Sequence, residues 1–461
     1  MVEEEVEDLS TASRLVSRIA MKFRGLIVAT VVLLALVGAL YWSGKHKAAD
    51  DATATKDAPP AILKLDEASI TKLEIKKKDV APLVLSKTNS GDWQILQPKL
   101  FGADQSTVSG VLGSLASLNS ERLVEEKTSD LKPYGLDQPR IEVDLTEKNN
   151  RSHRLLIGED TPTGGAVYAA LAGDPRVFTI ASYTKTSVDK SLNDLRDKRL
   201  LTVNPDKISR VELIRKNQTI EFGRDKDEWQ ILKPKPLRAD SYQVGELVQK
   251  LTGARMDFSG DDADAKKSAS LFASATPVAA AKVTDSSGTQ EIQIRKSKDI
   301  YYGKSSVVEG VYKVQSDLGQ AIDKSLDDFR NKKIFDFGFS DPSKVEMHNG
   351  TKALFLVRNG SDWWWNGKKM DAGTVQSLIA KLRDLSTSKF VESGFSNPPI
   401  EISVTSDDGK HIDKVSIAKS GDSYIAKPDN DASLYGLDSN AVDDLQKAAD
   451  EIKPATAVPS K

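Results

Sequence analysis

The sequence predicts an α+β protein, with one N-terminal transmembrane helix followed by tandem units of antiparallel β-sheet with packed helices. Three observations lead to this prediction. Residues 25–42 form an apolar stretch without a charged side chain. Tryptophans in a strand-like context, Trp93, Trp229 and Trp363, recur about every 135 residues. After each of these tryptophans, apolar residues follow the spacing of one face of a helix.

The composition excludes several classes of protein. The chain has 461 residues, which suggests about three domains at roughly 150 residues each. The chain has 65 basic and 67 acidic residues and therefore a net charge of −2, whereas a nucleic-acid-binding protein usually has an excess of basic residues. The absence of cysteine excludes disulfides, thiolate nucleophiles and thiolate metal ligands, and there are only four histidines. We therefore expect no nucleic acid, no cofactor and no metal to be bound.

Residues 25–42 are predicted to cross a membrane. At about 1.5 Å per residue they form roughly 27 Å of helix, close to the thickness of a bilayer core. The stretch ends in Tyr41 and Trp42, which favour the membrane interface, and cations precede it at Arg14, Arg18, Lys22 and Arg24. We expect a single-pass protein of the bacterial inner (cytoplasmic) membrane, with a cytoplasmic N-terminus and most of the chain periplasmic or extracytoplasmic.

A cleaved signal peptide is the alternative for this segment, because the small residues Ala48 and Ala49 follow it. The charged lead of residues 1–24 and the length of the apolar stretch favour an uncleaved anchor.

The chain is predicted to contain seven segments. The linker is rich in Lys, Asp, Ala and Thr, and it has little to bury. A repeat of this length is too long for a solenoid, so each unit should hold its own core; a shared sheet and separate lobes both fit the sequence. The segments are a cytoplasmic head (1–24), the transmembrane helix (25–42), a flexible linker (43–61), repeat unit 1 (62–203), repeat unit 2 (204–338), repeat unit 3 as a truncated variant (339–454), and a tail (455–461).

Each unit is predicted to open with strands and to pass into a helix. Apolar and polar residues alternate upstream of each tryptophan, as in half-buried strands. Asp104, Asp240 and Asp371 are predicted helix N-caps, because apolar residues stand four, seven, eight and eleven positions after each of them. The alternating apolar residues are Ile70, Leu73 and Ile75 in unit 1, Ile208, Val211 and Leu213 in unit 2, and Val345 and Met347 in unit 3.

The second half of each unit returns to strands, predicted at residues 141–145, 291–294 and 400–404. The first two units are predicted to close with a helix, because matching apolar residues recur there at helical spacing. Unit 3 retains only Val442 and Leu445 of this pattern. The matching residues are Val188, Leu192 and Leu195 in unit 1, and Ile322, Leu326 and Phe329 in unit 2.

This unit resembles the bacterial family called domain of unknown function 4340, over nearly all of residues 62–452. The resemblance implies a membrane-tethered extracytoplasmic protein, and some members are encoded beside gliding-type ABC transporter components. It implies no catalytic residues. Unit 2 lacks the Tyr-Gly-Leu-Asp segment, and unit 3 has it displaced to 435–438. The residues that carry the resemblance are an acid-Trp-x-Ile strand (Trp93, Trp229), a proline-bearing turn (Pro98, Pro234), an Ala-Asp helix start (Asp104, Asp240) and the segment Tyr134 to Pro139.

Motifs for catalysis or metal binding are not found in the sequence. The histidines stand at non-equivalent positions in the units, whereas a repeated site would repeat its ligands. Gly360, Gly367 and Lys368 lack the spacing of a phosphate loop. The acidic residues Asp261, Asp262 and Asp264 lack the central glycine of a calcium loop.

The run Trp363-Trp364-Trp365 is the most unusual local feature. Strand alternation sends Trp363 and Trp365 to one face and Trp364 to the other. An exposed indole often marks a contact surface for a protein or a sugar ring, and the alternative is that the preceding repeat or the tail covers Trp364. Our hypothesis is that Trp364 binds a partner, whereas Trp93, Trp229 and Trp363 are structural anchors that pack on the first helix of each unit.

These features favour a non-enzymatic, membrane-anchored scaffold or accessory protein of a transport or envelope complex. Its expected partners are the membrane and an envelope or transporter protein. A module that binds a polysaccharide or cell-wall polymer is the alternative, with a glycan as partner. A hydrolase ranks third, because it would need a cleft with perturbed carboxylates.

Overall fold

The computed structural model describes residues 60–456 except 227, 259–262, 340 and 407–408. Within these residues, no helix is both long and apolar enough to span a bilayer. The transmembrane helix predicted at residues 25–42, and most of the linker, lie outside the described residues. The chain divides after Asp197 into two compact units. The first unit contains one antiparallel sheet and the second contains two, so the fold is α+β with tandem sheets.

We call each sheet with its helices a module: module 1 is residues 60–197, module 2 is 198–330 and module 3 is 331–456. The sheet of module 1 has nine strands in the order β4-β3-β2-β1-β6-β7-β8-β9-β5. Its elements are β1 (Ile70–Lys77), β2 (Val80–Lys87), β3 (Trp93–Gln97), β4 (Phe101–Gly102), α2 (Gln105–Ala116), β5 (Arg122–Glu125), β6 (Ile141–Glu147), β7 (Ser152–Asp160), β8 (Ala166–Leu171), β9 (Val177–Ala181), α3 (Ser182–Val188) and α4 (Leu192–Leu195).

The sheet of module 2 has eight strands in the order β13-β12-β11-β10-β14-β15-β16-β17. Its elements are β10 (Arg210–Ile214), β11 (Thr219–Asp225), β12 (Glu228–Lys233), β13 (Leu237–Arg238), α5 (Ser241–Thr252), α6 (Ala263–Ser274), β14 (Thr276–Asp285), β15 (Gly288–Ser297), β16 (Ile300–Ser305), β17 (Tyr312–Val314), α7 (Ser316–Ile322) and α8 (Leu326–Phe329).

The sheet of module 3 has nine strands in the order β21-β20-β19-β18-β23-β24-β25-β26-β22. Its elements are β18 (Lys344–Asn349), β19 (Lys352–Asn359), β20 (Asp362–Trp365), β21 (Lys368–Lys369), α9 (Ala372–Asp384), β22 (Lys389–Val391), β23 (Ile400–Ser406), β24 (His411–Ser420), β25 (Ser423–Pro428), β26 (Leu434–Leu437) and α10 (Ser439–Asp450).

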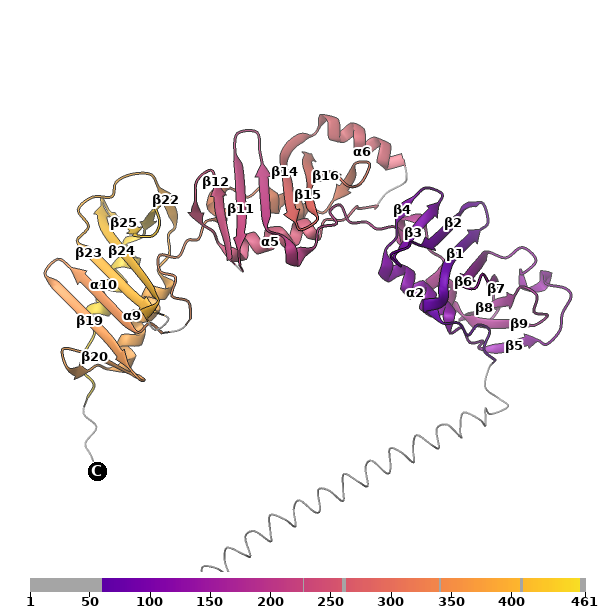
Figure 1. Cartoon of the computed structure of the whole chain (residues 1–461), viewed down its shortest axis with the longest axis horizontal. Coiled ribbons are helices and arrows are strands. Elements are labelled where there is room, and N and C mark those ends of the chain that lie inside the picture. Colours follow the sequence, from indigo (N-terminus) through magenta and orange to yellow (C-terminus); the bar gives the residue numbers. More distant parts are fainter. Residues whose placement is uncertain (1–59, 227, 259–262, 340, 407–408, 457–461) are drawn as a thin grey trace, which may run out of the picture. The chain divides into compact units, whose positions relative to one another are not determined.

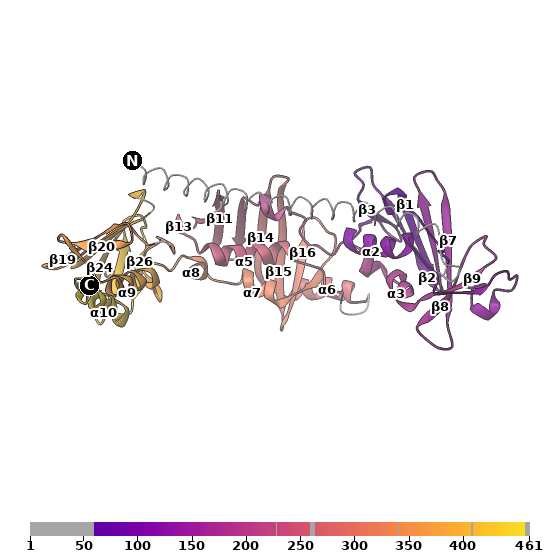
Figure 2. The same ribbon diagram turned by 90° about the horizontal axis from the view of Figure 1, so that it is seen from below.

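The same chain path builds all three sheets. A first hairpin is followed by the tryptophan strand, a two-residue strand and a helix, and the chain then returns to pair with the free edge of the first strand. The helices α2, α5 and α9 lie against the strands of their own sheets (Figures 1 and 2). The first strand of each module therefore pairs with a strand on both of its edges and lies in the middle of its sheet.

The first helix of each module begins at an aspartate. The Asp104 carboxylate accepts a hydrogen bond from the Thr107 N–H (2.8 Å), and the Asp371 carboxylate accepts one from the Thr374 N–H (3.0 Å). The Asp240 carboxylate accepts from the N–H groups of both Tyr242 and Gln243 (3.0 and 3.1 Å). These contacts satisfy backbone donors that have no partner inside the helix, which explains why the helix starts at the same place three times.

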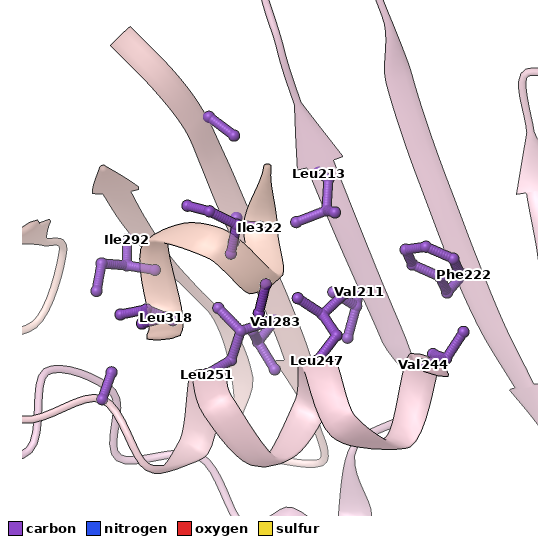
Figure 3. Packing of buried hydrophobic residues seen from close by; sticks show 14 of the residues in the cluster. Val211, Leu213, Phe222, Val244, Leu247, Leu251, Val283, Ile292, Leu318 and Ile322 are labelled. Carbon is purple, nitrogen blue, oxygen red and sulfur yellow. The ribbon is translucent and has the colours of Figure 1, made fainter. Parts of the chain in front are cut away.

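Each module has a hydrophobic core of its own. In module 2, Val211, Leu213 and Phe222 of the strands meet Val244 and Leu247 of α5 (Figure 3). The core clusters of the three modules share no residue. Leu200, Leu201 and Val203, which precede β10, pack in the core of module 2. Every module thus has the apolar contacts that a separate folding unit needs.

The single closing helix predicted for the first two units is wrong in one respect, because two short helices form instead. In module 1, α3 ends at Val188 and α4 begins after Ser191. Ser191 and Asp194 form a capping box, in which the Ser191 N–H donates to Asp194 Oδ2 (2.8 Å). In module 2, the Ser325 N–H donates to Asp328 Oδ2 in the same way (2.7 Å). This Ser-x-x-Asp pair starts a new helix, which interrupts the helical run although the apolar spacing continues.

Candidate functional site

The repeated tryptophans lie in the three cores. Trp93, Trp229 and Trp363 are only 6%, 8% and 3% exposed, and each belongs to the core cluster of its module. In module 1 the Gln105 amide at the start of α2 bonds to the Trp93 N–H (2.7 Å) and to its carbonyl oxygen (2.9 Å). The tryptophan strand is therefore tied directly to the capped end of the first helix.

Trp364 lies on the opposite face of the third sheet. Its side chain is 38% exposed, whereas Trp363 is buried and Trp365 is partly buried against the core. The side chains of β20 thus alternate between the two faces of the sheet, and Trp364 is on the outer face. Trp364 is the residue that the sequence analysis predicts to contact a partner.

Two further apolar side chains on β19 share this face with Trp364. Phe355 is 38% exposed and Val357 is 46% exposed, and Val357 lies directly opposite Trp364 in the pairing of β19 with β20. The His348 ring packs edge-on against Phe355, with 5.2 Å between the ring centroids. We call Phe355, Val357 and Trp364 the outer patch of module 3.

The cross-strand pair formed by Val357 and Trp364 differs from the corresponding pairs of the other modules. The buried tryptophan and its cross-strand partner define the register: Trp93 pairs with Lys87, Trp229 with Arg224 and Trp363 with Arg358. One residue further along, module 1 has the pair Ser86 and Gln94, and module 2 has Gly223 and Gln230. Module 3 has Val357 and Trp364 at this position, so the apolar pair distinguishes it from its neighbours in the chain.

The outer face of module 1 carries a network of ion pairs instead. Lys76 Nζ lies 3.0 Å from both Glu142 and Asp144, and Arg154 Nε lies 2.7 Å from Asp144. Partial burial acts to raise the pKa of Asp144, but hydrogen bonds from Arg154 and Lys76 outweigh it and the net pKa is lowered. This face is therefore well solvated, and its charges satisfy one another.

Module 2 has a smaller arrangement of the same kind. The side chain of Glu221, only 4% exposed, lies between Arg210 (2.5 Å) and Lys233 (2.7 Å). Burial acts to raise the pKa of Glu221, and the hydrogen bonds from Lys233 and Arg210 outweigh it, so that its pKa is lowered. Ion pairs thus occupy strands β1, β6 and β7 on the outer face of module 1 and strands β10, β11 and β12 on that of module 2.

The remaining titratable groups form no recognisable catalytic arrangement in the described part of the chain. Every carboxyl group there whose pKa departs from its ordinary value departs downward, whereas a glycosidase acid needs a raised pKa. His153 contacts Glu147 (3.2 Å) and His411 contacts Asp413 (3.1 Å), in different modules. No group of three or more potential ligands that could hold a metal is found among the described residues. Asp261 and Asp262 lie outside them.

Two stretches of the chain, residues 93–235 and 229–410, match the protein family described as Domain of unknown function (DUF4340). Together they cover more than half of the 461 residues. The chain belongs to this family. The matched stretches of this DUF4340 protein begin at Trp93 and Trp229, so each starts in the tryptophan strand of one sheet and ends within the next module.

No curated protein matches the DUF4340 chain. Among solved structures, the chain is similar to a DNA polymerase sliding clamp from Pseudomonas aeruginosa with a ligand, at 9% identity over 81% of this chain and 92% of that one, with a TM-score of 0.16. A second structure of the sliding clamp from this organism gives 9% identity, coverage of 82% and 93%, and a TM-score of 0.15. We draw nothing about fold or function from likenesses of this size.

Sequence reasoning identified Trp364 but missed Phe355 and Val357. The sequence does contain a signal that Phe355 and Val357 face outward, because they alternate with Leu354 and Leu356, which are buried. Their place beside Trp364 depends on the pairing of β19 with β20, which the sequence does not state.

Proposed function

We propose that this protein is a non-enzymatic, membrane-anchored extracytoplasmic scaffold or accessory subunit, and that the outer patch of module 3 binds a protein of a transport or envelope complex. The observation that carries the proposal is that Val357 and Trp364 form an apolar pair at the register where module 1 has Ser86 and Gln94 and module 2 has Gly223 and Gln230. An exposed aromatic group with apolar neighbours is typical of a contact surface, because a partner that covers it removes apolar area from water.

The sequence supports the anchoring part of the proposal. The uncharged residues 25–42 are long enough to cross a bilayer once, and cations precede them. Three modules on such an anchor would raise the local concentration of bound partners beside the membrane without any chemistry. The resemblance to family members encoded beside ABC transporter components makes a transporter subunit the first partner to seek.

In-cell crosslinking followed by affinity purification tests this function. The full-length chain is compared with a chain lacking residues 1–42, with Val357→Ser/Trp364→Gln, and with Leu100→Ser, which changes an exposed leucine of module 1. We expect the full-length chain and Leu100→Ser to recover the same envelope or transporter protein. The double variant should lose this protein while its melting temperature is unchanged. Equal recovery by the double variant, or recovery of no such protein by any form, would contradict the proposal.

A glycan-binding module is the second candidate function. The exposed Trp364 indole beside Phe355 favours it, because sugar rings stack on aromatic faces. Co-sedimentation with purified cell-wall polymer distinguishes the two: binding by both the anchored and truncated chains, lost in Trp364→Ala, would favour the glycan over a protein partner.

A further inference from the structure

Module 3 contains a cavity of about 270 Å³ on the side of its sheet that faces the helices. Met347 and Leu354 form its floor, pair across β18 and β19, and are 4% and 6% exposed. Its walls include Trp365 of β20, and Ala449 and Ile452 in and just after α10, all three partly buried against the core. The interior of the cavity is therefore apolar.

In modules 1 and 2 a long cation joins the corresponding strand end to the closing helices. Lys77, the last residue of β1, pairs through its Nζ with Asp189 (2.6 Å), just after α3. Arg215, just after β10, donates to the carbonyls of Ile322 (2.7 Å) and Lys324, at the break between α7 and α8. The space between strand end and helix is thus bridged in both modules.

Module 3 differs at both sides of this space. The strand pairings place Asn349 where Lys77 and Arg215 stand, and this shorter side chain lines the cavity. The closing helix α10 runs unbroken for twelve residues, whereas a short turn separates α3 from α4 and α7 from α8. In module 3 no long cation therefore extends from this strand end toward a break in the closing helix, and the cavity lies between them.

The mouth of the cavity is polar and carries more positive than negative charge. Lys352 Nζ lies 2.8 Å from the carboxylate of Asp450, which is the one acid among the described residues that line the cavity. Lys368 lies opposite Trp365 in the pairing of β20 with β21, so its side chain starts on the same face of the sheet. The Gln446 amide adds a neutral hydrogen-bonding group. This mouth suits an anionic group above an apolar interior.

We propose that this cavity binds a single acyl chain that ends in an anionic head group, as in a fatty acid. The chain would leave water for the apolar interior, and Lys352 and Lys368 would hold the head group at the mouth. An apolar protein cavity of about 150 Å³ accepts benzene, so in proportion this cavity accommodates about ten carbon atoms. It is smaller than the roughly 300–1,000 Å³ of pockets for drug-sized molecules, which favours one slender chain.

This inference does not rest on the proposed function, because the cavity and the outer patch lie on opposite sides of the sheet. The two can fail separately. Loss of the protein partner in the double variant Val357→Ser/Trp364→Gln should leave the binding of an acyl chain unchanged.

The test is a titration of decanoate into the full-length chain in lipid nanodiscs, with ¹³C in the methionine methyl groups. The chain has five methionines, and Met347→Leu identifies the NMR signal of Met347. We expect this signal to shift saturably, while that of Met256, in the core of module 2, stays in place. Hexanoate, which has four methylenes fewer, should bind at least about tenfold more weakly, because each buried methylene contributes to binding.

Three comparisons locate the bound chain. Ala449→Phe should abolish the shift of Met347, because the ring fills the cavity. Ala449→Leu adds less volume, should weaken decanoate binding at least about tenfold, and serves if the phenylalanine variant fails to fold. Decylammonium has the same chain with a positive head group and should bind at least about tenfold more weakly than decanoate. The matched control Val357→Ser/Trp364→Gln should bind decanoate as the parent chain does.

Any of three results would overturn the proposal. The first is the absence of a saturable shift of Met347 at millimolar decanoate. The second is equal decanoate binding by the parent chain and by folded Ala449→Phe or Ala449→Leu chains. The third is decylammonium binding as tight as that of decanoate, because the cations at the mouth would then not select the head group.

Discussion

Trp364 lies directly opposite Val357 across strands β20 and β19, at the register where Gln94 lies opposite Ser86 in the first sheet. Both pairs occupy the solvent-facing side of a sheet whose other side is a packed core. The backbone position is therefore common to the two modules, and only the polarity of the side chains differs. A change in these side chains should alter what the surface binds without altering the fold.

The first prediction concerns the stability of this patch. Replacing Val357 by Ser and Trp364 by Gln gives module 3 the pair that module 1 has at this position, Ser86 and Gln94. We expect the free energy of unfolding in urea to change by no more than about 0.5 kcal/mol for each substitution, because neither side chain supports the core. A loss of several kcal/mol would mean that the outer patch is part of the packing.

The core tryptophans should behave in the opposite way. Trp229→Ala removes a side chain that is 8% exposed and packs within the core of module 2. The expected loss is about 3–5 kcal/mol, because a large cavity remains. Hydrogen exchange followed by mass spectrometry should show lost protection in β11, β12 and α5, while peptides from module 1 keep theirs. Trp229→Phe is the control and should lose less.

The helix caps provide a third prediction. Asp240→Ala removes the acceptor for the N–H groups of Tyr242 and Gln243, which should cost about 0.5–2 kcal/mol. Asp240→Asn keeps a side-chain oxygen at this position and should cost much less. The difference between the two variants, measured by urea unfolding, separates the hydrogen bond from the charge; equal losses would show that the cap acts through its charge alone.

The fourth prediction concerns pH. Hydrogen bonds from the Ser287 hydroxyl (2.6 Å) and from the backbone N–H groups of Asn204 (2.7 Å) and Ser287 (2.8 Å) lower the pKa of Asp285 to about 2. In the unfolded chain an aspartate titrates near pH 4, at about 3.9. The stabilisation is therefore complete above about pH 4 and is lost as the pH falls toward about 2.

Asp285→Asn is the variant that measures this contribution. The difference in free energy of unfolding between the parent chain and the variant should be largest at neutral pH and should shrink between about pH 4 and about pH 2. Subtraction removes the effect of the other carboxylates, which both chains share. A difference that stays constant with pH would show that the charge of Asp285 does not stabilise the fold.

Local features were predictable from the sequence, and features that depend on pairing were not. The starts of α2, α5 and α9 follow from an aspartate and apolar residues within one helix, so the signal is contiguous. The break before α4 also had a local signal in Ser191 and Asp194, but the apolar spacing that runs through it predicts one helix. Strand pairing brings Phe355 and Val357 beside Trp364, and a sequence does not state which strands pair.

The segment from Arg330 to Lys333 joins the last two modules through its hydrogen bonds. The Asn331 N–H donates back to the Arg238 carbonyl (2.9 Å), and the Lys332 carbonyl accepts from the Thr387 N–H (2.8 Å). Neighbouring residues of one connecting segment thus bond to different modules. If either module unfolds, this segment loses its hydrogen bonds to that module, so the free energy of each module includes a contribution from its neighbour. The two modules should then unfold with a cooperativity that neither would have alone, and an insertion between Asn331 and Lys332 would separate their transitions.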